Sequence, residues 1–459
     1  MKRLLIIALA LCLALAPLAG CARPPQGDYN PDENPDFGNW EDGPKTLSVY
    51  TVGGPLHYDY KENDPDPDFQ TTQYIIDTFK VSHPGVTVKM DGGAWGTDLN
   101  NALRELYMAN KMPDIVVGEL FNKTQINDLE YYQHMAVPQD IKDAIRKPFW
   151  DQCTGDDGRI YGYPMFTGCS ALIYNENLVR AAGLVNPDGS LKIPETMDEL
   201  KNYAAQVYSN SGGSVGGLLV NAVPGIPSAY RNIVIMQMFG GGFYNDAGDI
   251  IINGAESKAA MQWIKDVAAY AYSGNAALGE EGQVNKLFLD NKVAFAIESG
   301  PLTYARDIPT SQFKSAPLPV VEGVPSTNML VGSPSYMMTR ASRNKALAQE
   351  FLNHLVSYDV QKQIYMCSSN RVPVRDDLIL DLLASDDPDV QAKNAFMSPF
   401  IESLYVAENL VAGLPGFDAN FTKIWGSWTT AIQNILGNGQ SVAANLDNFA
   451  ADVIAYTAV

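Results

Sequence analysis

The sequence KTLSVYTV, residues 45–52, opens a run of alternating strand and helix patterns that decides the fold. Apolar and β-branched residues predict strands over this stretch, over VTVKM (86–90) and over PDIVVG (113–118). Between the strands, TTQYIIDTFKVS (71–82) and TDLNNALRELYMANK (97–111) carry apolar residues at helical spacing. Strands that alternate with helices indicate a parallel sheet covered by helices.

Ligands of such sheets bind beyond the carboxyl ends of the strands, which here means the loops after Val52, Met90 and Val117. The middle of the chain also mixes strand and helix patterns, with strands predicted at SALIYN (170–175) and KVAFAIESG (292–300) and helical patterns around them. The sequence has no internal repeat. We therefore expect an α/β protein with two lobes.

The N-terminus reads as an export signal. Lys2 and Arg3 precede an apolar run from Leu4 to Ala16, which is shorter than the about 20 residues that span a bilayer. This pattern predicts a secretory signal peptide over residues 1–20, and a short membrane anchor is the alternative. The sequence LAGC, ending at Cys21, resembles the bacterial lipobox. In signals of that kind the cysteine becomes the N-terminus and carries a diacylglyceryl thioether, so the resemblance implies lipidation of Cys21.

Residues 21–44 are rich in proline, aspartate and asparagine and poor in aliphatic residues. Such a segment cannot bury enough apolar surface to offset the entropy of the chain. We expect a disordered tether between the lipid and a soluble body that begins near Lys45.

The composition restricts the function. The chain has 459 residues, 46% of them hydrophobic, which suffices for two or three filled cores. Its net charge of −20 argues against nucleic acid as a partner and disfavours anionic ligands. The body has three cysteines, Cys153, Cys169 and Cys367, without metal-site spacing. A disulfide between the first two and three buried thiols are both open. With no phosphate-binding loop either, we expect no metal and no cofactor.

Segments spread over nearly the whole body resemble, in their order, the landmarks of the extracellular solute-binding protein family 1. This family holds the maltose- and other sugar-binding subunits of ABC importers. The segments include SHPGVTVKM (82–90), ALRELYMANKMPDIVV (102–117), DDGRIYGYPMFTGCSALIYNENLVRAAGL (156–184), IPETMDELKNYAAQV (193–207), RVPVRDDL (371–378) and WGSWTTAIQNILGNG (425–439).

The resemblance implies a two-lobed periplasmic-binding-protein-like fold of type II, with hinge strands and a ligand cleft between the lobes. It assigns residues 45–139 and 319–371 to the N-terminal lobe, and 140–318 and 372–459 to the C-terminal lobe. The implied function is that of a lipid-anchored, monomeric binding protein on the outer face of the cell membrane. It captures an oligosaccharide and delivers it to the transmembrane permease subunits, and it catalyses nothing.

A sugar has hydroxyls around its rim and C–H patches on its faces, so its site needs flat aromatic rings and planar polar side chains. The resemblance implies that Trp425 stacks on the ligand; Trp428, three residues on, shares its helix face. The alternative is that both tryptophans belong to the core. Leu302 stands where relatives often have a tryptophan after Gly-Pro, and Glu298 or Tyr304 are the candidates to compensate.

Further candidates follow the strands of the first lobe. Glu119 ends the PDIVVGE strand, and Trp95 lies in a glycine-rich loop. His57 and Tyr58 follow the first strand, in an unusually long loop. Tyr230, with Arg231 beside it, is a candidate in the second lobe.

Three alternatives remain open. Residues 212–216, GGSVG, match the G-x-S-x-G string of serine hydrolases, but a helix pattern precedes them and a strand pattern follows, which is the reverse of a nucleophile elbow. A glycosidase with two carboxylates cannot be recognised from spacing. The same binding body could also serve a membrane sensor, or bind another small solute such as a peptide.

Overall fold

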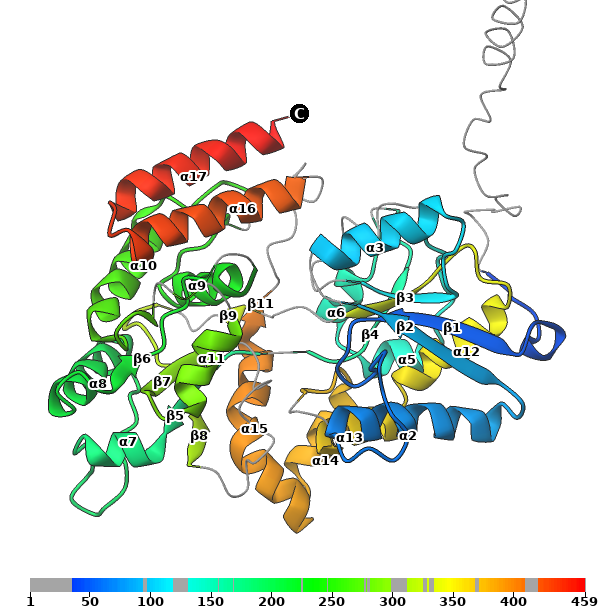
Figure 1. Cartoon of the computed structure of the whole chain (residues 1–459), viewed down its shortest axis with the longest axis horizontal. Helices are drawn as coiled ribbons and strands as arrows, with labels where there is room; N and C mark the ends of the chain where they lie inside the picture. The colour runs from blue at the N-terminus through cyan, green and yellow to red at the C-terminus, as the bar shows by residue number, and fades with distance from the viewer. Residues whose placement is uncertain are drawn as a thin grey trace, which may run out of the picture.

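The computed structural model shows two lobes, each built on its own sheet with helices around it (Figure 1). The residues that it describes are 35–93, 97–118, 131–155, 157–167, 169–223, 226–245, 247–275, 278, 281–298, 312–324, 328–329, 334–367, 371–408 and 420–458.

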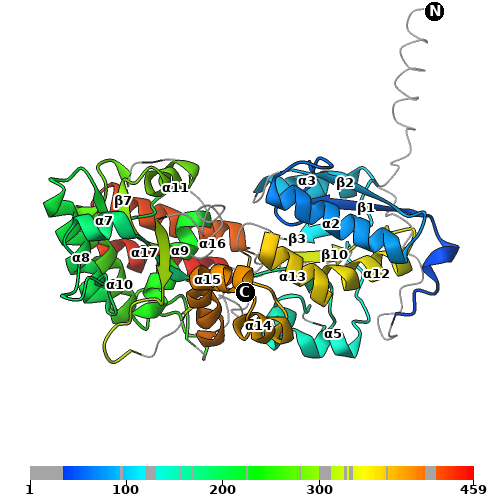
Figure 2. The same cartoon turned by 90° about the horizontal axis from the view of Figure 1, so that it is seen from below.

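The first lobe contains a five-stranded sheet in the order β2-β1-β3-β10-β4. Its strands are β1 (Thr46–Thr51), β2 (Thr87–Gly92), β3 (Ile115–Gly118), β4 (Gly162–Pro164) and β10 (Ser335–Met338). β1 pairs in parallel with β2 and with β3, as the sequence predicts, whereas β10 runs antiparallel to β3 and β4. All four residues of β3 are buried, because helices cover both faces of the sheet (Figures 1 and 2).

The helices of this lobe form two layers. α2 (Pro67–Ser82), α12 (Lys345–Leu355) and α13 (Tyr358–Cys367) lie on one side of the sheet, and α3 (Thr97–Met108) lies on the other (Figures 1 and 2). α2 begins four residues before the predicted helix at 71–82. Its start is set by Asp66, which accepts a hydrogen bond from the Asp68 amide (3.0 Å), and by Pro67 in the first turn.

The second lobe contains a four-stranded sheet in the order β6-β7-β5-β8. Its strands are β5 (Ala171–Asn175), β6 (Gly216–Leu218), β7 (Val293–Glu298) and β8 (Phe313–Ala316). β6 and β7 are parallel, and β5 is antiparallel to β7 and to β8. The carboxyl ends of β6 and β7 therefore lie at the same edge of the sheet.

Eight helices of the described chain accompany this sheet: α7 (Glu176–Ala181), α8 (Met197–Asn210), α9 (Ile226–Met238), α10 (Ala255–Val267), α11 (Glu281–Leu289), α15 (Pro388–Val406), α16 (Phe421–Ile432) and α17 (Val442–Thr457). α8 starts at Thr196 with a capping box in which Thr196 and Glu199 satisfy each other's backbone amides.

The remaining elements are η1 (Trp40–Asp42), α5 (Gln139–Ala144), α6 (Lys147–Gln152), η2 (Ala268–Tyr270), β9 (Asn328–Met329), α14 (Asp376–Leu383), β11 (Ala407–Glu408) and the π-helical η6 (Gln433–Gly437).

The chain passes from the first lobe to the second after β4, returns between β8 and β10, and passes to the second lobe again near residue 372. At the first and the last of these crossings Thr167 and Val372 form an antiparallel bridge, with N–H···O distances of 2.9 and 3.2 Å. The predicted boundary between residues 139 and 140 comes too early, because β4 pairs with β10 and so extends the first sheet to Pro164. This pairing joins residues far apart in the sequence, and no local pattern announces it. The other lobe boundaries stay predictions.

Part of the predicted tether is docked. Asn344, at the start of α12, donates from Nδ2 to the carbonyls of Trp40 (2.8 Å) and Pro44 (3.1 Å). The Trp40 ring lies 4.8 Å from the His83 ring and beneath the ammonium of Lys45 (4.3 Å). Residues 35–44 are therefore part of the first lobe, which corrects the expected disordered segment 21–44. Its remainder, with Cys21, lies outside the described residues.

Two of the thiols are free. Cys153 and Cys169 are fully buried and form no disulfide, so the disulfide alternative is wrong. Burial raises the pKa of each thiol to about 12. The side chain of Cys367 is not described. Across the described ranges, no group of three or more histidine, cysteine or carboxylate side chains is placed to hold a metal ion.

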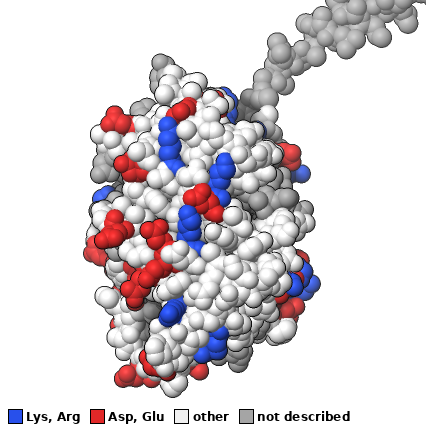
Figure 3. Space-filling model, turned by 90° about the vertical axis from the view of Figure 1, so that its left-hand side faces the viewer, with Lys and Arg blue, Asp and Glu red and all other residues white. Residues whose placement is uncertain are grey.

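The surface and the helices bear on membranes and nucleic acids. No helix among the described residues is both long and apolar enough to cross a bilayer. On the face of the second lobe shown in Figure 3, basic side chains lie mainly along the middle, with acidic ones beside and between them. Ion pairs such as Lys201–Asp266 (3.0 Å) and Lys258–Asp447 (2.8 Å) mix the two signs in this lobe. Paired charges of both signs differ from the clustered lysines and arginines that bind a nucleic-acid backbone.

Candidate functional site

The carboxyl edge of the first sheet is shaped by two hydroxyls and a glycine. Thr51 ends β1, donates from Oγ1 to the Leu56 carbonyl (2.9 Å) and accepts from the Tyr336 hydroxyl (2.8 Å). Gly92 ends β2, and a Cβ there would overlap the Thr51 carbonyl and come within 2.6 Å of the Tyr58 Cβ. Glycine is therefore required here, and it lets the loop after β1 pass directly over the strand ends.

His57 and Tyr58, both predicted ligand residues, form a ring pair in this loop. The His57 ring stacks on Tyr58 (centroids 5.0 Å apart) and meets Phe69 edge-on (4.9 Å). The backbone is fixed because the His57 amide donates to Thr72 Oγ1 (2.8 Å). Tyr58 is 38% exposed, so the pair presents an aromatic surface at the edge where ligands of this fold bind.

Arg371 lies at the crossing near residue 372, close to the same edge. Its guanidinium lies 4.4 Å from the ring centroid of Phe166, and its Nε has no hydrogen-bond partner among the described residues. A Cβ on Gly54, just beyond β1, would lie 3.3 Å from its Nη2. Burial lowers the pKa of this guanidinium to about 10, against an opposing effect of the Asp68 carboxylate, so it stays charged at neutral pH. A stacked guanidinium with a free donor suits a planar or vicinal pair of acceptor oxygens.

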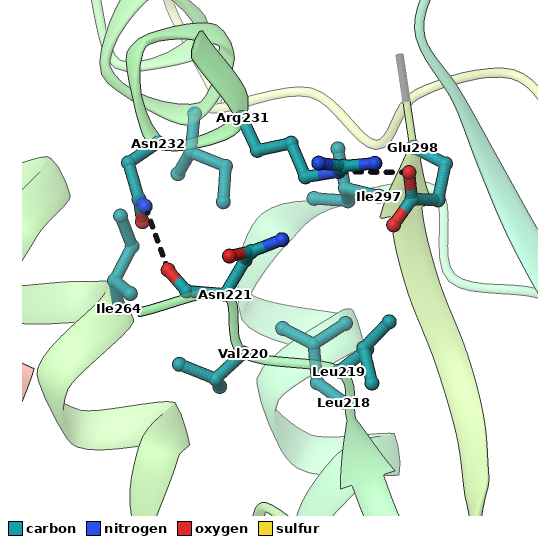
Figure 4. Close-up of a pocket in the computed structure, with 10 residues that line it drawn as sticks. Leu218, Leu219, Val220, Asn221, Arg231, Asn232, Ile264, Ile297 and Glu298 are labelled. Carbon is teal, nitrogen blue, oxygen red and sulfur yellow. Dashed lines mark hydrogen bonds and ion pairs between the residues drawn. The ribbon is translucent and has the colours of Figure 1, made fainter. Parts of the chain in front are cut away.

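A small cavity at the carboxyl ends of β6 and β7 forms the second half of the candidate site (Figure 4). Its lining comes from these strands, the segment after β6, α9 and α10. The lining residues are Leu218, Leu219, Val220, Asn221, Arg231, Asn232, Ile235, Ile264, Ile297 and Glu298.

The cavity contains a buried ion pair. Arg231 Nε lies 2.8 Å from Glu298 Oε2, and the two side chains are 10% and 2% exposed. Asn221 faces this pair in Figure 4, and its backbone carbonyl accepts from Asn232 Nδ2 (2.9 Å). Its side-chain oxygen accepts from the Val223 amide (3.4 Å), whereas its Nδ2 has no partner among the described residues. The site therefore combines a fixed carboxylate with an unused amide donor.

Trp425 lies deeper than the stacking prediction implies. It is 3% exposed and packs at 5.8 Å from Phe243, which also meets Trp428 and Phe449. The indole nitrogen of Trp428 donates to the Ala229 carbonyl on α9 (2.9 Å). The pair thus fixes α16 against α9 beside the cavity. The core role is observed, and the stacking role of Trp425 stays a prediction.

The other predicted residues are only partly placed. Trp95, Glu119 and Tyr304 lie outside the described residues. Tyr230 is on α9, but its side chain is not described. Of the predicted set, the structure brings His57 and Tyr58 together in the first lobe and places Glu298 with Arg231 in the second. The sequence reasoning missed Asn221, Tyr336 and Arg371, although Arg371 opens the quoted segment RVPVRDDL.

The sequence profile of the family described as bacterial extracellular solute-binding protein matches residues 74–398. This chain belongs to that family. The maltodextrin-binding protein MdxE of Bacillus subtilis (strain 168) is 22% identical over 280 residues, which are 58% of this chain and 61% of the relative. The chain thus spans about three fifths of the length of this curated relative.

Solved structures confirm the fold of this solute-binding protein. The GacH receptor of Streptomyces glaucescens GLA.O matches with a TM-score of 0.71 at 18% identity, covering 90% of this chain and 98% of the receptor. An ABC transporter solute-binding protein from Thermotoga lettingae TMO matches with 0.71 at 22% identity, covering 90% and 100%. The predicted two-lobed type II fold is therefore correct.

The hydrolase string of the solute-binding protein has no elbow geometry. Ser214 lies in a turn between α8 and β6, where Gly212 and Gly213 adopt φ of +62° and +81°. Its hydroxyl donates to the Ser211 carbonyl (2.8 Å). A nucleophile elbow leads from a strand into a helix, and here a helix leads into a strand. This serine is a turn residue.

Proposed function

We propose that this protein binds a carbohydrate, an oligosaccharide in particular, between its two lobes and catalyses no reaction on it. The observation that carries the proposal is the pair of half-sites at the carboxyl edges of the two sheets. The first offers the His57–Tyr58 ring pair and the Arg371 fork, and the second offers Asn221 and Glu298. Rings for C–H faces and planar polar groups for hydroxyls are what a sugar requires.

Relatives support the choice of ligand. MdxE is named for maltodextrin, the GacH receptor was solved in complex with acarbose, and the Thermotoga protein was solved with α-D-tagatose. These are three different saccharide-type ligands held by one fold. We propose a saccharide as the ligand of this chain, without assigning it any one of these three ligands.

The mechanism follows from the two lobes. Periplasmic binding proteins close by hinge motion around their ligand. The crossings at Thr167 and Val372 are the candidate hinge, because these two connecting segments pair with each other in an antiparallel bridge. A ligand stabilises the closed state only through its higher affinity for that state. Contacts from both half-sites at once provide this difference, since the open form offers each of them separately.

Delivery completes the proposal. The closed form hands its sugar to the transmembrane permease subunits of an ABC importer, and lipidated Cys21 holds the monomer at the outer face of the membrane. The lipobox-like LAGC sequence supports the anchor, and family membership supports an extracellular setting. A lipid-modified tryptic peptide starting at Cys21 would establish the anchor.

The test is a thermal-shift screen of the mature protein against mono- and oligosaccharides. The tested chain includes residues 35–44, because they pack on the first lobe. A ligand at 100 times its dissociation constant adds about 2.7 kcal/mol to the free energy of unfolding. We expect at least one saccharide to raise the melting temperature and to be recovered unchanged. Stabilisation by peptides alone, or turnover of a bound glycoside, contradicts the proposal.

A further inference from the structure

The cavity in the second lobe has one polar group without a partner among the described residues, the side-chain amide nitrogen of Asn221. Asn221 is 6% exposed, so its amide is removed from bulk water, yet its Nδ2 has no partner among the described residues. A buried donor without an acceptor costs about 1–3 kcal/mol. In Figure 4 this amide points towards the Arg231–Glu298 pair across the cavity. The arrangement calls for an oxygen that accepts from Asn221.

The size of the cavity restricts what can enter. The centre of a water-sized group can move within about 20 Å³ of it. A single water needs about 10–15 Å³ of such space, so one oxygen fits and a sugar ring does not. The walls beside the polar groups are aliphatic, with Leu219, Ile235 and Ile297 among them. One hydroxyl with its carbon matches both the polar and the apolar lining.

We propose that this cavity binds the exocyclic hydroxymethyl group of the bound saccharide, and that one water occupies the oxygen position when no ligand is present. The inference rests on the proposed carbohydrate ligand and makes the site specific within that class. Asn221 donates to the hydroxyl oxygen, and the Glu298 carboxylate accepts the hydroxyl proton. The methylene lies against the aliphatic wall. Arg231 is a positioning residue, because it holds Glu298 by the 2.8 Å ion pair.

The consequence is discrimination between hexoses and pentoses. A sugar that lacks the hydroxymethyl group leaves the cavity to water and loses the methylene contacts. A missing group of this size changes binding by about tenfold or more, because its hydrogen bonds and its methylene contacts are lost together. Selectivity of this kind depends on one buried amide, and not on the rings of the first lobe.

The experiment compares matched sugars by calorimetric titration of the mature protein. The pairs are D-glucose and D-xylose, and D-galactose and L-arabinose, whose members differ by one hydroxymethyl group, and cellobiose and xylobiose, which differ by one on each ring. We expect the hexose member of a binding pair to bind at least about tenfold more tightly. Equal affinity within a binding pair overturns this inference and leaves the proposed function standing. If no saccharide binds in the wider screen, both fall together.

Two variants assign the selectivity to the cavity. Asn221→Leu removes the donor and should reduce the hexose preference to less than about threefold, chiefly by weakening hexose binding. Asn445→Leu is the control, because Asn445 is similarly buried (8% exposed) but lies on α17 and does not line the cavity. It should leave the preference unchanged. If Asn221→Leu retains the preference, the inference is wrong; if the variant does not fold, the wild-type sugar pairs decide.

A crystal structure of the unliganded protein separates water from sugar as the source of the oxygen. We expect one ordered water within about 3.2 Å of Asn221 Nδ2. In the complex with the preferred hexose, the hydroxymethyl oxygen should replace it. A cavity that stays dry without ligand, or that keeps its water in the complex, contradicts the assignment.

Discussion

Arg146 of the first lobe donates a hydrogen bond from Nη1 to the backbone carbonyl of Leu404 on α15 (2.8 Å). α15 packs on the sheet of the second lobe, so this bond joins the two lobes. Leu404 lies in the last turn of α15, where carbonyls lack intrahelical partners and attract cations. Arg146 also lies 3.8 Å from the Asp376 carboxylate and stacks over the Tyr405 ring at 4.8 Å.

Loss of the hydrogen bond between Arg146 and Leu404 should weaken the coupling of the two lobes. We expect Arg146→Met to lower the free energy of unfolding by about 1 kcal/mol, the usual value of a partly exposed charged hydrogen bond. Urea unfolding measures the loss. Lys147→Met is the matched control, since the neighbouring pair Lys147–Asp151 is exposed and should contribute less than about 0.5 kcal/mol. Equal losses of unfolding free energy in the two variants would show that the Arg146 contact does not stabilise the protein.

Replacing one member of the Arg231–Glu298 pair should lower the free energy of unfolding more than replacing both. Removing one partner leaves a buried charge alone, so Arg231→Met and Glu298→Gln should each cost about 3–5 kcal/mol. The double variant should regain much of that loss, because no charge then remains uncompensated. A double-mutant cycle in urea tests this. Additive losses in the double variant would mean that the two side chains do not interact.

Arg371 should affect binding more than folding. Arg371→Lys keeps the charge but loses the planar fork and much of the stacking on Phe166. We expect it to weaken binding of the saccharide found in the screen by about tenfold, or about 1.4 kcal/mol. Arg180→Lys, which changes an exposed arginine on α7, should leave binding as it is. Unchanged affinity in Arg371→Lys would remove Arg371 from the site.

Two variants of Trp425 distinguish a role in the core from a role in ligand binding. Trp425→Ala leaves a cavity beside Phe243 and should cost about 3–5 kcal/mol of stability. Trp425→Phe keeps most of the packing and provides a folded protein for titration. A loss of sugar affinity in this variant would support stacking on the ligand. Wild-type affinity together with lowered stability would assign the residue to the core alone.

His354 should make the first lobe sensitive to acid. Burial, helped by nearby His83, lowers its pKa below the ordinary value of 6.5 against the opposing effects of its hydrogen bond to the Ile75 carbonyl (3.0 Å) and of Asp359. The unfolded chain therefore takes up the proton first. This contribution to stability is complete above pH 6.5 and is lost as the pH falls through the lower, folded-state pKa. Urea midpoints from pH 7.5 to 5 should fall more steeply in the wild type than in His354→Gln; parallel curves would exclude the effect.

Local patterns predicted the elements and the edges of the site. The strand predicted at 45–52 is confirmed as β1, and the capping box at Thr196 and Glu199 is likewise fixed by neighbours in sequence. β4 could not be found in this way, because its three residues become a strand only through pairing with β10. The start of α2 could have been predicted correctly from the sequence, because an aspartate followed by a proline, here Asp66 and Pro67, is a common beginning of a helix.

The same distinction applies to the site. The parallel-sheet rule directed attention to strand ends, and His57 and Tyr58 lie in the loop after β1, while Glu298, a candidate from the family resemblance, ends β7. The partner of Glu298 is Arg231, 67 positions away, and their 2.8 Å contact results from how α9 packs on the sheet. Arg371 depends on a crossing segment that meets Phe166. Contacts of this kind come from tertiary packing, and periodicity alone does not reveal them.

The docking of η1 on α12 ties the segment before β1 to the first lobe. Asn344 donates to the Trp40 and Pro44 carbonyls, and the Trp40 ring lies against His83 of the same lobe. If Cys21 carries the proposed lipid, a force on the N-terminal segment would act on the first lobe, and the second lobe would be the one left free to rotate.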